Sequence, residues 1–88
     1  MNLNEIQSKL SELNDWELKL DSLEKNFFFK TTEEQKKFLN QILDIGEKLS
    51  HSPIILIDRK IVKLTLSSGK EGITEQDFSL AKEIDKIS

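Results

Sequence analysis

The chain has 88 residues, of which 36% are hydrophobic and 33% charged, with a formal net charge of −3 and no cysteine. This length and composition predict one small folded domain over residues 1–88 rather than a disordered segment. The acidic balance provides no basic surface for a phosphate backbone, and no apolar run reaches the ~20 residues of a membrane-spanning helix. We therefore expect a soluble cytoplasmic protein without a nucleic-acid or membrane partner.

The first part of the chain predicts a short helix followed by a hairpin. Leucine and isoleucine recur at helical spacing over 3–13, and Asn14-Asp15 then favours a turn. Apolar and charged residues alternate over 16–20, which predicts a half-buried strand with its three apolar residues on one face. A second strand is expected to follow Asp21-Ser22 and to include 26–30, with Phe28 facing away from the two phenylalanines beside it.

A second helix is predicted from the Thr31-Thr32-Glu33-Glu34 capping signal to about Ser50. Its apolar residues form two adjacent stripes, which indicates two packing partners. The stripes are Phe38, Ile42, Ile45 and Leu49, and Leu39, Leu43 and Gly46. A glycine inside a helix is roughly 0.5–1 kcal/mol less favourable than alanine. Gly46 therefore either admits another backbone at close range or is tolerated near a fraying end.

The second half predicts another hairpin and a final helix. Pro53 ends the helical run and an apolar strand follows over 54–57, connected by Asp58-Arg59-Lys60 to an alternating strand over 61–68. After a glycine-containing loop over 69–72, Thr74 to Asp77 caps a helix whose apolar residues are Leu80, Ala81, Ile84 and Ile87. The order αββαββα favours an α+β two-layer sandwich, with a four-stranded antiparallel sheet and helices on one face.

His51 is the only histidine and the strongest candidate for acid–base chemistry, because an imidazole exchanges protons near neutral pH. Glu47 lies one helical turn earlier and could accept a ring N–H and orient the imidazole. Alternatively, His51 simply sits at the negative end of the second helix and is partly solvated. One histidine without cysteine cannot build the usual zinc sites, so we expect neither a metal nor a cofactor.

Several segments make the chain similar to the pterin-4a-carbinolamine dehydratases. They are Trp16 at the start of the first strand, FFFK over 27–30, EKLSHSP over 47–53, VKLTLSS over 62–68 and GITEQDFSLAKEID over 72–85. The resemblance covers nearly the whole chain. It implies a hydro-lyase that removes water from 4a-hydroxytetrahydrobiopterin, or from a related pterin, to regenerate the cofactor of aromatic amino acid hydroxylases.

The resemblance is incomplete at the reactive positions. Glu47, His51, Pro53 and Asp77 match the family pattern at its usual spacing, but Ser52 and Gly69 replace two of its three histidines and Arg59 replaces an aromatic residue. The reaction needs an acid for the leaving hydroxyl and a base for the ring proton. We therefore expect weak or lost dehydratase activity, with His51 and Glu47 as the catalytic residues.

The resemblance also implies the residues that would contact a pterin. They are Trp16, Ser52, Pro53, Ser67, Ser68, Gly69 and Asp77. Several of these have ordinary structural alternatives that stay open here. Trp16 can be a core residue, the two serines can be turn residues at a strand end, and Asp77 can be a helix-capping carboxylate.

The apolar strand over 54–57 predicts association, because it lacks the charges that usually protect an exposed sheet edge. The family resemblance implies a homodimer formed edge to edge, and a tetramer in which the second helix packs against its copies. An alternative function is therefore a noncatalytic dimeric protein that binds a protein partner. The superfamily includes transcriptional coactivators and Rubisco assembly factors of this kind.

Overall fold

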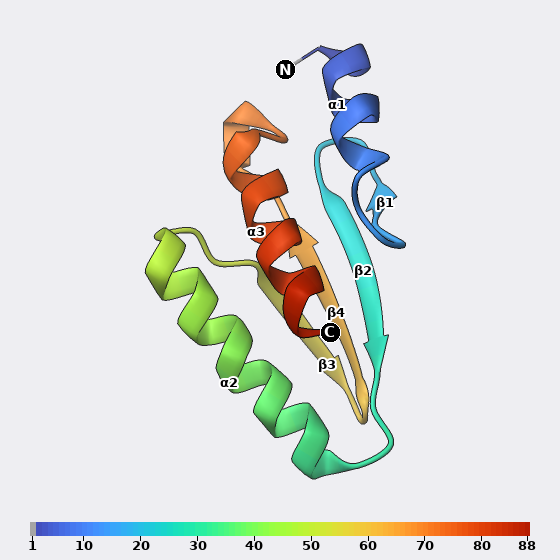
Figure 1. Ribbon diagram of the computed structural model, residues 1–88, viewed down its shortest axis with the longest axis vertical. Coiled ribbons are helices and arrows are strands. Elements are labelled where there is room, and N and C mark those ends of the chain that lie inside the picture. Colours follow the sequence, from blue (N-terminus) through green and yellow to red (C-terminus); the bar gives the residue numbers. More distant parts are fainter. Residues whose placement is uncertain (1) are drawn as a thin grey trace.

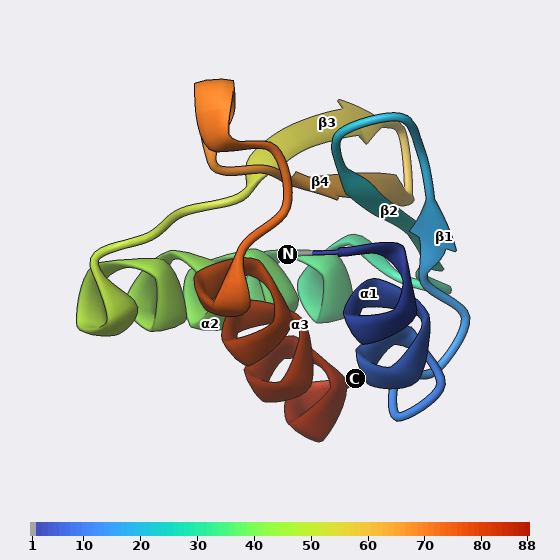
Figure 2. The same cartoon turned by 90° about the horizontal axis from the view of Figure 1, so that it is seen from above.

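The computed structural model describes residues 2–88 and forms two layers, a sheet and the helices that cover one of its faces (Figures 1 and 2). The elements are α1 (Leu3–Leu10), β1 (Glu17–Leu18), β2 (Leu23–Phe28), α2 (Thr32–Leu49), β3 (Ile54–Asp58), β4 (Ile61–Leu66), a 3-10 turn η1 (Gly69–Glu71) and α3 (Glu75–Ile87). All strand pairs are antiparallel and the sheet order is β1-β2-β4-β3. The predicted α+β sandwich is confirmed.

The core lies between the inner face of the sheet and helices α2 and α3. Val62, Leu64 and Leu66 of β4 are fully buried, as their alternation with polar residues predicted. The helices contribute buried residues from the predicted stripes, among them Phe38, Ile42, Leu80, Ala81 and Ile84. Strand β4 lies between β2 and β3, and the segment that follows it leads through η1 to the start of α3. No helix among residues 2–88 is both long and apolar enough to cross a membrane.

The first hairpin differs from its prediction. The amide of Lys19 donates to the carbonyl of Ser22 at 2.8 Å, so Leu20 and Asp21 form the tip of a tight turn. Leu20 is consequently 101% exposed, while Trp16 is only 6% exposed. The expectation that Trp16, Leu18 and Leu20 share a buried face is therefore wrong, because the turn ends the strand before Leu20. Strand β2 begins at Leu23, directly after Asp21-Ser22 as expected, but it ends at Phe28 rather than at Lys30.

Helix α2 begins and ends through specific backbone contacts. The hydroxyl of Thr31 accepts the amide of Glu34 at 3.1 Å, which confirms the predicted cap. At the other end, Ser50 adopts a left-handed conformation with φ of 54°. The amide of His51 donates to the carbonyl of Gly46 at 3.0 Å, and that of Ser50 to Glu47 at 3.2 Å, as in a Schellman motif.

The same turn explains Gly46. A Cβ atom at this position would lie 2.7 Å from Oγ and 3.2 Å from Cα of Ser52. Of the two interpretations of this glycine, the structure therefore favours close approach by another part of the backbone. The chain can double back against the last turn of α2 only because the side chain there is a hydrogen atom.

Candidate functional site

The candidate site is built where three segments meet, namely the turn after α2, the end of β4 and the first turn of α3. They contribute His51, Ser68 and the pair Thr74 and Asp77. The Schellman turn places His51 just beyond α2, and the sheet pairing carries β4 to the same end of the molecule. Residues distant in the sequence are thereby brought into one hydrogen-bonded cluster.

The imidazole of His51 contacts the carboxylate of Asp77. Nε2 of His51 lies 2.6 Å from Oδ1 of Asp77, and the two side chains are 15% and 0% exposed. An ionised carboxylate accepts hydrogen bonds but donates none, so Nε2 carries the proton in this pair. The tautomer is thus assigned from the contact. Nδ1 is left as the ring nitrogen that can accept a proton from a ligand.

Asp77 is stabilised in the protein interior by further donors. Its Oδ2 accepts the hydroxyl of Ser68 and the backbone amide of Thr74, each at 2.9 Å. The Ser68 hydroxyl also lies 2.8 Å from Oγ1 of Thr74. A buried carboxylate needs such partners, because burial without them is strongly unfavourable. Asp77 therefore helps to cap α3 and holds His51 at the same time.

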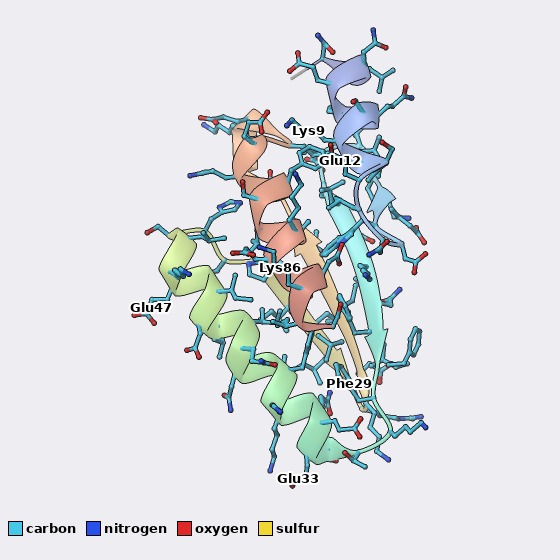
Figure 3. The ribbon with its side chains drawn as sticks, viewed as in Figure 1. Lys9, Glu12, Phe29, Glu33, Glu47 and Lys86 are labelled. Atoms are coloured by element: carbon cyan, nitrogen blue, oxygen red, sulfur yellow. The ribbon has the colours of Figure 1, made fainter. Side chains whose placement is uncertain are left out.

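Glu47 does not make the contact with His51 that the helical spacing suggested. Its side chain is exposed and points away from α3 (Figure 3). The physical reason is the left-handed turn at Ser50, which ends the helix before His51 and directs the imidazole toward α3. A residue one helical turn earlier is a neighbour only while the helix continues.

Trp16 lies in the core, at the opposite end of α3. Its indole Nε1 donates to Oδ1 of Asp85 at 2.9 Å, and Nζ of Lys25 lies 3.0 Å from the same oxygen. Asp85 and Asp77 are eight residues apart on α3, which corresponds to about 12 Å along a helix. The Lys25–Asp85 pair was not predicted from the sequence. The available signal was a lysine at an inward position of β2, between Leu23 and Phe27.

The other predicted substrate-binding residues do not join the hydrogen-bonded cluster. Ser52 is exposed and packs against Gly46, and Pro53 is half-buried. The hydroxyl of Ser67 donates to the carbonyl of Asp21 at 3.0 Å, and Gly69 starts η1 with a φ of 65°. Within residues 2–88, the hydrogen bonds link none of these four side chains to His51.

A small pocket opens beside the imidazole, with a volume of about 220 Å³. Its lining residues are Leu49, His51, Glu75, Gln76 and Ser79. The three residues from α3 were missed by sequence reasoning. Their spacing in the first turns of a helix capped at Thr74 was the available signal, since residues three or four apart share a helix face.

Comparison with known proteins shows the family to which the chain belongs. The family model described as pterin 4 alpha carbinolamine dehydratase matches residues 1–87. The chain belongs to this family. A relative in Sulfolobus acidocaldarius that bears the name pterin-4-alpha-carbinolamine dehydratase is 39% identical over 85 residues, covering 96% of this chain and 93% of its own. A relative of the same name in Sulfurisphaera tokodaii is 36% identical over 85 residues, covering 94% and 90%.

Two solved structures share the fold. A crystal structure titled as a transcriptional coactivator/pterin dehydratase from Brucella melitensis has a TM-score of 0.92 and 27% identity, covering 99% of this chain and 96% of that one. A pterin dehydratase-like protein described as a RuBisCO assembly factor in the alpha-carboxysome has a TM-score of 0.68 and 22% identity, covering 82% and 84%. The second likeness shows the fold alone.

Proposed function

We propose that this member of the pterin-4a-carbinolamine dehydratase family binds a pterin beside His51 and dehydrates 4a-hydroxytetrahydrobiopterin, or a related pterin, at a low rate. Family membership supports the ligand class. The observation that carries the proposal is the His51–Asp77 pair, in which a fully buried carboxylate holds one ring nitrogen of a histidine that lines a pocket. Such a pair prepares the other nitrogen for proton transfer.

In the proposed reaction, Nδ1 of His51 takes the proton from a pterin ring nitrogen. The electron pair released from the N–H bond forms a C=N bond as the C–O bond at the hydroxyl-bearing carbon breaks. The hydroxyl leaves as water after receiving a proton, either from the imidazolium or from solvent. Asp77 lies 2.6 Å from Nε2 and holds the ring in position during the transfer.

The low rate follows from the missing partners of His51. Ser52 and Gly69 stand where the family resemblance places two further histidines, and a serine hydroxyl hardly ionises at neutral pH without an adjacent base. A single positioned acid or base contributes about 10²–10⁴-fold in rate. One imidazole that serves both steps in turn would therefore act more slowly than a set of three.

Stopped-flow absorbance with 4a-hydroxytetrahydropterin tests the proposal. We expect the protein to accelerate dehydration above buffer, and His51→Ala to remove that acceleration. Asn40→Ala, on the exposed surface of α2, serves as the matched control and should retain it. A wild-type protein that does not exceed buffer would refute the enzymatic function.

A noncatalytic dimeric binding protein is the second candidate, and the edge of the sheet favours it. Strand β3 is an edge strand, and its Ile54, Leu56 and Ile57 are 65%, 56% and 54% exposed. An apolar edge without protection tends to pair with another strand, so we infer that a second copy covers it. The Brucella melitensis protein, whose title includes a coactivator role, is a relative with the same fold.

Light scattering coupled to gel filtration tests this association. We expect a species of at least twice the 10.2 kDa chain mass. Leu56→Lys should reduce it to a monomer, while Asn26→Lys, on the same outer face but in β2, should not. A tetramer would need a further contact through α2, where Leu43 is 58% exposed, and Leu43→Lys should then leave a dimer. A wild-type monomer at micromolar concentration would contradict both assemblies.

A further inference from the structure

The start of α3 presents polar side chains to the pocket beside His51. Gln76 and Ser79 both line the pocket and are exposed. They are three residues apart on the helix, so their side chains lie on one face. Among residues 2–88, neither side chain takes part in a hydrogen bond, unlike Asp77 between them. Their donors and acceptors are free to bind a ligand.

The other walls limit what that ligand can be. Leu49 supplies an apolar surface and His51 an imidazole. The volume of about 220 Å³ is below the roughly 300–1,000 Å³ typical of sites for drug-sized molecules. The pocket therefore suits a small ring whose substituents extend into solvent. Such a ring would lie between the imidazole and the polar residues of α3.

Glu75 is the other polar residue in the pocket, but its carboxylate is already engaged. Oε2 of Glu75 forms an ion pair with Nζ of Lys9 on α1 at 3.0 Å. The carboxamide of Gln76 is consequently a better candidate than the Glu75 carboxylate for hydrogen bonding to a neutral heterocycle. An amide offers one acceptor and one donor side by side, which matches a ring edge that carries an N–H next to a C=O.

We propose that Gln76 determines ligand specificity by pairing with the lactam edge of a pterin ring. The carboxamide oxygen accepts the ring N–H, and the carboxamide NH₂ donates to the adjacent ring carbonyl. Ser79 contributes a further hydroxyl on the same wall. This inference rests on the proposed pterin-binding function and adds the residue that would orient the ring, with its reacting atoms toward Nδ1 of His51.

Binding measured by isothermal titration calorimetry tests the role of Gln76 separately from catalysis. The probe is 7,8-dihydrobiopterin, which keeps the lactam edge but has no 4a-hydroxyl group to lose. Gln76→Leu keeps a similar side-chain size and removes both hydrogen bonds. Gln7→Leu, on an exposed position of α1 outside the pocket, is the matched control. Quinoxaline, a bicyclic ring without a lactam, is the comparison ligand.

We expect Gln76→Leu to weaken dihydrobiopterin binding by about tenfold, because the lactam edge loses its partners on entering the pocket. Gln7→Leu should leave the dissociation constant unchanged, and any binding of quinoxaline should be the same in all three proteins. Equal dihydrobiopterin affinities for wild type and Gln76→Leu would overturn the assignment of Gln76 and leave the proposed function intact. Failure of the wild-type protein to bind dihydrobiopterin would overturn both.

Discussion

Asp77 contacts His51 at 2.6 Å and also accepts the backbone amide of Thr74 at the start of α3. One carboxylate thus fixes the orientation of the imidazole and the position of the helix. We expect Asp77→Asn to lower the free energy of unfolding by about 1–3 kcal/mol, because a buried acceptor with several donors is replaced by an amide that cannot satisfy them all.

Urea unfolding of Asp77→Asn measures this loss, and Asp44→Asn on the exposed face of α2 is the control that should change little. The same Asp77 variant should lose whatever dehydration depends on His51. A variant with wild-type stability would contradict the structural role of the carboxylate, whatever its activity.

Gly46 and Ser52 should be energetically coupled, because a Cβ at Gly46 would lie 2.7 Å from Oγ of Ser52. Overpacking of this kind is unfavourable by about 1–3 kcal/mol, whereas alanine in a helix gains roughly 1 kcal/mol over glycine. We expect Gly46→Ala to destabilise the protein by about 1 kcal/mol, and to do so less when Ser52→Gly is already present. A double-mutant cycle by urea unfolding measures the coupling, and strictly additive effects would contradict the contact.

Removing Asp85 should lower the free energy of unfolding more than removing its ion-pair partner Lys25. Both side chains are 12% exposed, and Asp85 also accepts the Trp16 indole N–H and the Asn14 amide. Asp85→Ala removes the shared acceptor and should be unfavourable by about 3–5 kcal/mol. Lys25→Met leaves Asp85 with two donors and keeps the apolar stem of the lysine, so its effect should be smaller.

Thermal and urea unfolding of the two variants provide the comparison. Lys86→Met is the control, because Lys86 forms an ion pair with Glu83 on the surface of α3. Surface ion pairs contribute little to the free energy of unfolding. A larger loss for Lys25→Met than for Asp85→Ala would show that the lysine, rather than the carboxylate, is the critical partner.

Arg59 at the β3–β4 turn has a φ of 58°, in the left-handed region that favours glycine. The carbonyl of Arg59 accepts the side-chain amide of Gln35 at 2.7 Å, so the turn is held in place from α2. We expect Arg59→Gly to stabilise the fold by about 1 kcal/mol, which raises Tm by roughly 4–8 °C in a domain of this size. Lys60→Gly should give no such increase, and a lower Tm for Arg59→Gly would contradict the prediction.

Local patterns predicted much of this fold. The alternation in β4 and the Thr31 cap of α2 were both confirmed, since each depends on residues close together in the chain. The end of the first strand was wrong because the 19–22 turn has no glycine or proline to mark it. The partner of His51 could not be chosen from spacing, because Glu47 and Asp77 were both available carboxylates. Only the turn after α2 decides between them.

The indole hydrogen bond between Trp16 and Asp85 also provides a spectroscopic reporter. Trp16 is the only tryptophan, so the intrinsic fluorescence of the chain comes almost entirely from one ring docked against α3. Its emission wavelength should shift to the red when that helix detaches from the sheet. Partial opening of the domain could therefore be followed in real time without attaching a dye.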